Sequence, residues 1–123
     1  MFKIKKSIVL FSIIVLLASC TENKNAELIL GNWQATQWLV GGNPSNNNVN
    51  ETSFSFDDKS AYTYNYAGTI VKGTYKVDNT SLYTTAEKEQ EIMVNITKLT
   101  ADSLTFEMNR GGQAETLILI KKK

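Results

Sequence analysis

The sequence predicts an all-β fold: an eight-stranded up-and-down antiparallel β-barrel preceded by a short N-terminal helical turn. Short segments in which apolar and polar residues alternate recur between residues 31 and 120, a pattern typical of strands with one buried face. All connections but one are short turns, so consecutive strands should be antiparallel neighbours. Closure into a barrel removes exposed strand edges. A two-sheet sandwich is the alternative, because residues 31–120 allow only short strands.

The first strand begins at Gly31 and contains Trp33 and Trp38. The polar residues between and beside these tryptophans follow no simple alternation, so the facing of Trp38 stays open. Gly73 lies on the inward face of its strand, which predicts a sharp bend or close packing there. The other seven strands are predicted over residues 52–57, 60–66, 70–77, 80–85, 91–98, 103–109 and 114–120.

The first and the last segment of the predicted domain are both apolar. Residues 26–30 form a short apolar patch before Gly31, which predicts one helical turn with a glycine cap. The last strand contains Leu117-Ile118-Leu119-Ile120 and is apolar on both faces, so its outer face needs a cover. Because a closed meander brings the chain ends together, we expect Leu28-Ile29-Leu30 to supply that cover.

One connection is long. Residues 41–51 are polar, rich in asparagine, and hold the only proline, Pro44. Long loops in small domains are either functional or disordered. Two interpretations therefore stay open: a lid over one end of the barrel, and a mobile loop without a role.

The N-terminal segment has a basic head, an apolar run and small residues before Cys20, which is the layout of a secretory signal. Leu17-Ala18-Ser19-Cys20 resembles the lipobox of bacterial lipoproteins. This resemblance implies a signal peptide over residues 1–19, acylation of Cys20, and a polar tether over residues 20–27 before a domain at residues 28–123. Several acyl chains make a stable membrane anchor. Thr21 is not the aspartate that retains many lipoproteins in the inner membrane, so the outer membrane is expected.

Composition excludes several functions. The chain has no histidine and one cysteine, so the usual general base is missing and an intrachain disulfide is impossible. From Cys20 onward the chain has ten basic and twelve acidic side chains, a formal net charge of −2. This charge argues against nucleic acid as a partner. We expect no enzymatic activity, no metal site and no cofactor, and we interpret Glu87, Glu89 and Glu91 as a solvated turn.

Gly31-Asn32-Trp33 resembles the Gly-x-Trp signature of lipocalins, and the chain from about residue 28 to 120 resembles the short lipocalin-like lipoproteins of Gram-negative bacteria. Their motifs correspond to residues 52–57, 73–78 and 103–106. The resemblance implies that Gly31 and Trp33 close the base of the barrel. The usual Thr-Asp-Tyr is replaced by Thr100-Ala101-Asp102. Where the family stacks an arginine on the Trp ring, the nearest cations are Lys121 and Lys122, which lack the guanidinium plane.

Inward aromatic rings suggest a binding function, since ligand pockets are commonly lined by aromatics with a few polar tips. The first hypothesis is a monomeric carrier of a small hydrophobic ligand; the second is a filled barrel that binds an envelope protein, for example a foreign enzyme. Asp102-Ser103-Leu104 also resembles a bacterial O-glycosylation acceptor, with Ser103 as the modified residue. The residues predicted to line the ligand site are Phe54, Phe56, Tyr62, Tyr64, Tyr66, Tyr75 and Phe106.

Overall fold

The computed structural model describes residues 24–123. The predicted signal peptide over residues 1–19 and the predicted lipidation site at Cys20 lie outside the described residues. Within the described part of the chain, no helix is long and apolar enough to cross a membrane.

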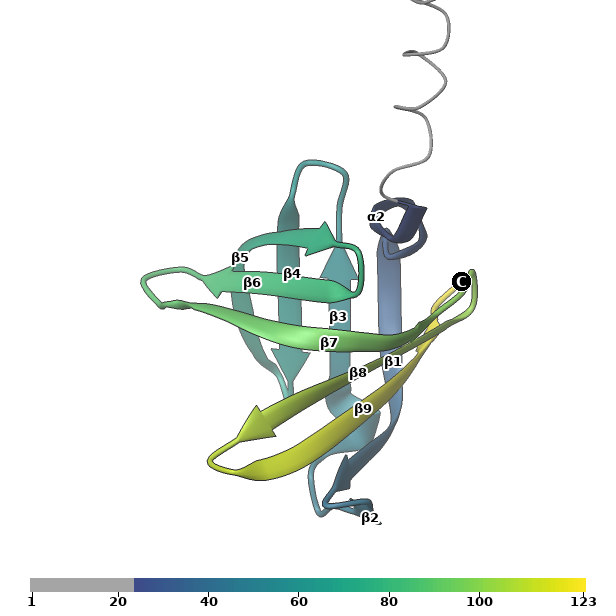
Figure 1. Ribbon diagram of the computed structural model, residues 1–123, viewed down its shortest axis with the longest axis vertical. Helices are drawn as coiled ribbons and strands as arrows, with labels where there is room; N and C mark the ends of the chain where they lie inside the picture. Colours follow the sequence, from purple (N-terminus) through teal and green to yellow (C-terminus); the bar gives the residue numbers. More distant parts are fainter. Residues whose placement is uncertain (1–23) are drawn as a thin grey trace, which may run out of the picture.

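One short helix, one 3-10 turn and nine strands make up the described chain (Figure 1). The helix α2 spans Lys24–Leu28 and so includes residues of the predicted tether. The strands are β1 (Gly31–Val40), β2 (Asn43–Pro44), β3 (Thr52–Phe56), β4 (Ala61–Tyr66), β5 (Thr69–Asp78), β6 (Ser81–Ala86), β7 (Glu91–Leu99), β8 (Ser103–Arg110) and β9 (Gln113–Lys121), and the 3-10 turn η2 spans Val49–Glu51.

The sheet closes on itself. Each strand from β3 to β9 pairs with the next in an antiparallel ladder, β1 pairs with β3, and β1 also pairs with β9 along most of its length. The two-residue strand β2 pairs only with β1 and is not one of the eight strands that form the barrel wall. The predicted eight-stranded up-and-down barrel is therefore confirmed, and the two-sheet sandwich is excluded.

Tight turns end the strands where the sequence placed them. Ser60, Ala67, Asn79 and Lys88 adopt positive φ angles between 52° and 66°, a left-handed conformation that tight turns use although it costs a residue with a Cβ about 1–2 kcal/mol. Gly73 allows β5 and β6 to approach closely, because a Cβ there would lie 2.1 Å from the Thr85 carbonyl oxygen. The predicted close packing at this glycine is confirmed.

A bulge in β1 settles the facing of Trp38. The β1–β9 register shifts between Ala35 and Gln37, and one extra residue in a strand reverses the parity of the side chains beyond it. As a result Trp33, Ala35 and Trp38 all point inward and are 0%, 3% and 5% exposed. Both tryptophans belong to the core.

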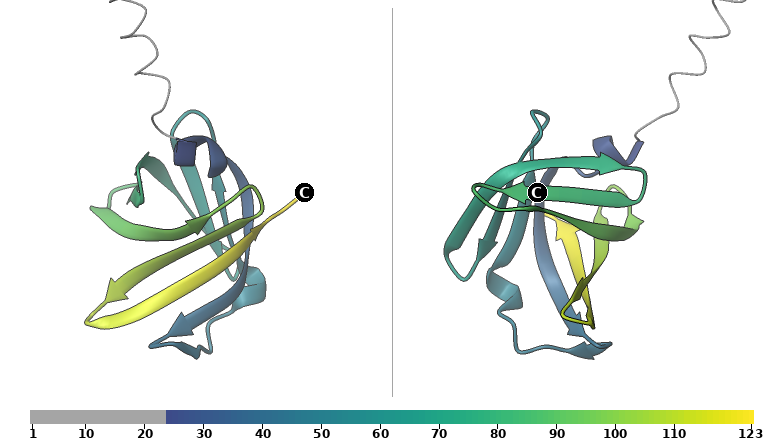
Figure 2. Two further views of the ribbon diagram at one scale, coloured as in Figure 1. Left: turned by 45° about the vertical axis from the view of Figure 1, so that its right-hand side comes forward. Right: turned by 60° about the vertical axis from the view of Figure 1, so that its left-hand side comes forward.

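The two ends of the barrel differ. The sealed end carries α2, the β5–β6 and β7–β8 turns and the C-terminus, whereas the open end carries the β6–β7 and β8–β9 hairpins and residues 41–51 (Figures 1 and 2). Ile29 is fully buried at the sealed end. The predicted cover for the outer face of β9 is wrong, because Ile29 packs inside the barrel and Ile120 stays 49% exposed. The strands of a closed barrel leave its two ends uncovered, and the Ile29 side chain fills the sealed end.

The long loop is held against the barrel. Thr52 Oγ1 donates a hydrogen bond to the Asn48 carbonyl at 2.6 Å, and the Asn48 N–H donates to the Tyr66 hydroxyl at 3.2 Å. The Gln34 amide donates to the carbonyls of Val49 and Asn50, and Val49 packs against the core. The loop therefore has a defined conformation at the open end.

Candidate functional site

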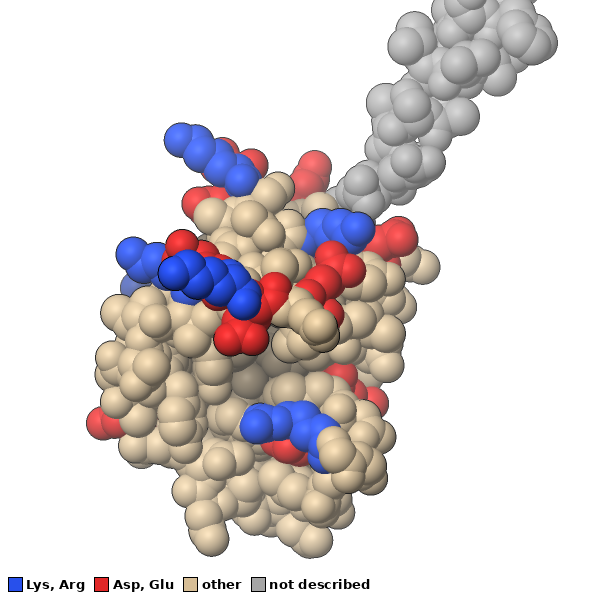
Figure 3. All heavy atoms as spheres, turned by 90° about the vertical axis from the view of Figure 1, so that its left-hand side faces the viewer, with Lys and Arg blue, Asp and Glu red and all other residues tan. Residues whose placement is uncertain are grey.

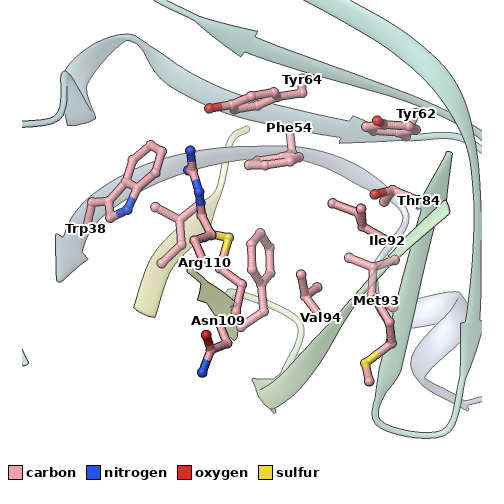
Figure 4. A pocket seen from close by; sticks show the side chains of 14 residues that line it. Trp38, Phe54, Tyr62, Tyr64, Thr84, Ile92, Met93, Val94, Asn109 and Arg110 are labelled. Atoms are coloured by element: carbon pink, nitrogen blue, oxygen red, sulfur yellow. The ribbon is translucent and has the colours of Figure 1, made fainter. Parts of the chain in front are cut away.

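The barrel holds a cavity of about 360 Å³ at the open end, between β3, β4, β6, β7, β8 and β9 (Figure 4). This volume falls within the range of roughly 300–1,000 Å³ that ligand pockets occupy. Most of its surface is apolar, supplied by aromatic and aliphatic side chains from opposite walls. The lining residues are Trp38, Phe54, Tyr62, Tyr64, Leu82, Thr84, Ile92, Met93, Val94, Phe106, Met108, Asn109, Arg110 and Leu117.

Four of the seven aromatic residues predicted for a ligand site line this cavity: Phe54, Tyr62, Tyr64 and Phe106. Phe54 is the centre of the aromatic wall. Its ring stacks on Tyr64 with the centroids 4.6 Å apart and meets Phe106 edge-on at 5.4 Å. The geometry leaves the rings packed on one side and exposed to the cavity on the other.

The other three predicted residues serve the scaffold. Phe56 is 1% exposed and lies deep in the core. The Tyr75 hydroxyl donates a hydrogen bond to the Asp57 carbonyl at 2.7 Å, which ties β5 to the turn after β3. The Tyr66 hydroxyl accepts the Asn48 N–H from the long loop. These rings face inward as predicted but lie outside the cavity wall.

The cavity opens sideways where β7 and β8 separate. The β7–β8 ladder runs from Leu99 paired with Leu104 only as far as Asn95 paired with Glu107, although β7 stays paired with β6 to Glu91 and β8 with β9 to Arg110. Beyond Asn95 the two strands diverge toward their hairpins (Figure 2). Figure 3 views the molecule from this side and shows a hollow in the surface with charged side chains above and below it.

The separation of β7 from β8 explains the exposure of Ile92. Ile92 and Met93 line the cavity yet are 58% and 50% exposed. Ile92 belongs to the inward row of β7 with Val94 and Ile96, and it loses its cover only because β8 has moved away. The mouth of the cavity is therefore apolar on its β7 side.

A buried acid on the closing strand contacts two residues of the cavity wall. Glu115 is 9% exposed and lies on the inward row of β9 with Leu117 and Leu119. One carboxylate oxygen accepts the Trp38 indole N–H at 2.7 Å, and the other lies 3.5 Å from Arg110 Nε. Burying a carboxylate costs several kcal/mol unless it is paired. The contacts with Trp38 and Arg110 therefore offset the cost of burying the Glu115 carboxylate.

Two tyrosines on the wall are perturbed by burial. Burial raises the pKa of Tyr64 above its ordinary 10.0, with the neighbouring Tyr66 adding to the rise and Arg110 opposing it. Burial also raises the pKa of Tyr62, while its side-chain hydrogen bond with Thr84 works in the opposite direction. Both hydroxyls therefore remain protonated at neutral pH and can donate a hydrogen bond.

Sequence reasoning missed the polar members of this site. Glu115 is the odd residue in the inward row of β9, and its alternation with Leu117 and Leu119 was a usable signal. Arg110 follows the predicted strand over residues 103–109, and nothing in the local pattern indicates that its side chain returns over the cavity. Trp38 was ambiguous because the bulge reverses the parity of β1.

The remaining candidates lie apart from the cavity. No residue of the loop 41–51 lines it, and Ser103 begins β8 with its backbone N–H donated to Thr100 Oγ1. Gly31 and Trp33 lie at the sealed end. Within residues 24–123, no three Cys, Asp or Glu side chains are grouped closely enough to hold a metal ion.

A closed antiparallel barrel with an apolar cavity that opens at one end is the architecture of small-molecule-binding barrels. A model of the lipocalin-like domain matches residues 29–106, and the chain therefore belongs to the lipocalin-like domain family. The crystal structure of a lipocalin-like protein from Bacteroides uniformis superposes with a TM-score of 0.60 at 14% identity, covering 76% of this chain and 98% of that one. Comparison with curated proteins finds no match.

Proposed function

We propose that this protein binds a small apolar molecule in the open-end cavity and acts as a non-enzymatic carrier or receptor. The observation that carries the proposal is the apolar cavity of about 360 Å³ inside the barrel. Apolar surface removed from water contributes about 25 cal/mol per Å² to binding, and Phe54, Phe106 and Leu117 supply such surface on opposite walls. The lipocalin-like fold supports ligand binding in general terms.

We propose further that the barrel is a monomer held at the outer membrane through an acylated Cys20. This part of the proposal rests on the lipobox resemblance of residues 17–20. Metabolic labelling with a radioactive fatty acid tests it. Label is expected in the chain and is expected to disappear in Cys20→Ser; unlabelled protein would contradict the anchor without affecting the cavity.

The binding proposal is tested with N-phenylnaphthylamine, a neutral apolar fluorophore whose emission rises in an apolar site. The purified protein is expected to enhance its emission saturably at micromolar concentration. Val94→Phe should reduce this enhancement strongly, because Val94 is 7% exposed and its side chain lines the cavity. The matched control is Ile70→Phe, which enlarges an outer-face side chain that is already 57% exposed.

Circular dichroism must show that both variants are folded. Absence of saturable enhancement in the wild-type protein, or equal enhancement by Val94→Phe and wild type, would contradict ligand binding at this site.

A second candidate function is binding of an envelope protein at the open end. The observation that favours it is the exposure of Ile92 and Met93 beside the mouth, since exposed apolar side chains that cluster mark interaction sites. Replacing both residues with Ser should abolish co-purification of a partner while the emission of N-phenylnaphthylamine stays enhanced. Loss of both signals would assign these side chains to the ligand site instead.

A further inference from the structure

The mouth of the cavity carries one acid and one base, and they are not equally accessible. The Glu115 side chain is 11% exposed, whereas the Arg110 side chain is 62% exposed. Both carboxylate oxygens of Glu115 have partners, one in the Trp38 indole and one in the guanidinium. Arg110 is therefore the more exposed member of the pair, and it is the charged side chain among the residues that line the cavity.

The guanidinium of Arg110 is oriented by this pairing. Its Nε faces Glu115, and within residues 24–123 no other hydrogen bond or ion pair of the Arg110 side chain is formed. The edge that carries the two Nη groups is thus available. An arginine offers two parallel N–H groups along that edge, which matches the geometry of a carboxylate or another oxyanion.

The available edge lies beside the apolar cavity. Figure 4 shows the guanidinium of Arg110 between Trp38 on one side and the rings of Phe54 and Tyr64 on the other. Arg110, Phe54 and Leu117 line the same cavity. A molecule bound in this cavity would place its buried part against the aromatic wall and its outer end against the guanidinium.

Resting on the proposed ligand-binding function, we propose that the ligand is an amphiphile with one apolar chain and an anionic oxyanion head. The apolar chain occupies the cavity between Phe54, Phe106 and Val94, and the head group binds to the Nη edge of Arg110. Arg110 is then the residue that determines specificity, and Glu115, its ion-pair partner, lowers the net positive charge that the head group meets.

The test compares two probes that share one alkyl chain: decanoate, which is anionic at neutral pH, and decanol, which is neutral. Each displaces N-phenylnaphthylamine from the purified protein, so their dissociation constants are measured in the same assay. Decanoate is expected to bind about tenfold more tightly than decanol, because a charge-assisted hydrogen bond at a partly exposed guanidinium exceeds a neutral one by roughly this factor.

Two variants separate the roles of the charged pair. Arg110→Gln should weaken decanoate about tenfold and leave decanol unchanged. Glu115→Gln keeps an acceptor for the Trp38 indole but removes the opposing negative charge, so it should strengthen decanoate and leave decanol unchanged. Opposite effects of the two substitutions on one probe would not follow from a purely structural role. Lys76→Gln, which removes one positive charge on the outer face of β5, is the matched control and should change neither constant.

Several outcomes would overturn the proposal. Equal affinities for decanoate and decanol, or a loss of both in Arg110→Gln, would refute anionic head recognition while N-phenylnaphthylamine binding keeps the proposed function intact. Tighter binding of decylamine than of decanoate would assign the head-group site to Glu115 and a cation. Failure of every probe, the neutral fluorophore included, would instead refute the proposed function itself.

Discussion

The two tryptophans of β1 occupy opposite ends of the same barrel and have opposite surroundings. Trp33, at the sealed end, is fully buried; its indole N–H donates to the Ile29 carbonyl at 2.8 Å, and Lys121 Nζ lies 4.6 Å from the centre of its ring. Trp38, at the open end, donates to the Glu115 carboxylate, whose other oxygen faces Arg110. Each indole has an acceptor and a nearby cation.

The two ends differ in what the cation near each indole contacts. Lys121 is turned inward and donates hydrogen bonds to the carbonyls of Leu28 and Leu30, so it ties the N-terminal turn to the closing strand. Gly31 leaves room for it, since a Cβ there would lie 3.2 Å from Lys121 Nζ. Arg110 is exposed and faces the cavity mouth. At the sealed end the Lys121 ammonium is therefore used in contacts within the protein. At the open end the Arg110 guanidinium stays exposed beside the cavity.

Replacing Trp33 with Ala should have the largest effect. The ring fills the sealed end between Ile29 and the core, so its removal should lower the free energy of unfolding by about 3–5 kcal/mol. Urea denaturation of Trp33→Ala and wild type measures the difference. A variant that keeps its stability and loses N-phenylnaphthylamine binding would show that Trp33 belongs to the ligand site.

Replacing Trp38 with Phe should cost less. The ring volume is largely kept, but Glu115 loses the indole N–H that satisfies one of its oxygens, a loss worth about 1–3 kcal/mol. Adding Glu115→Gln to Trp38→Phe should recover part of this loss, because a neutral amide is less costly to leave unpaired. No recovery in the double variant would mean that ring packing, rather than the hydrogen bond, accounts for the cost.

Replacing Lys121 with Met tests the seal without removing the ring. The cation over the Trp33 ring contributes about 0.5–2 kcal/mol, and Met also removes the donor to the Leu28 and Leu30 carbonyls, so thermal or urea unfolding should report a loss of at least this size. The control is Lys122→Met, which removes the same charge one residue later, where the exposed side chain faces outward. Similar losses in the two variants would contradict a specific role for Lys121.

The smallest effect is expected at alkaline pH. Because burial, followed by the charge of Tyr66, raises the pKa of Tyr64 above 10.0, the native protein keeps this proton to a higher pH than the unfolded chain does. The corresponding stability is fully present below pH 10.0 and is lost as the pH rises through the native pKa. Urea unfolding at increasing pH should therefore show a shallower decline for Tyr64→Phe than for wild type. An equal decline would exclude a contribution from Tyr64; part of the decline remains in any case, since burial also raises the pKa of Tyr62 and Tyr75.

The alternation of residues was enough to place the strands and the class of fold. The rows Leu104–Phe106–Met108 and Val94–Ile96 face inward as predicted. Successive side chains of a strand point to opposite faces, so a strand with one solvent-exposed face alternates apolar and polar residues. The seal at Trp33 followed from the same reasoning together with the family resemblance, and the structure adds that Lys121 takes the place over the ring.

Three features depended on the folded chain. The bulge at Thr36 turns Trp38 inward. The pairing of β1 with β9 brings Glu115, 77 residues away along the chain, to the Trp38 indole. The divergence of β7 from β8 opens the cavity. Local alternation is the same in a paired and an unpaired stretch of strand, so it cannot indicate where a ladder ends. The sequence pattern thus predicts which residues can face a barrel interior, whereas long-range strand pairing decides which of them meet around a cavity.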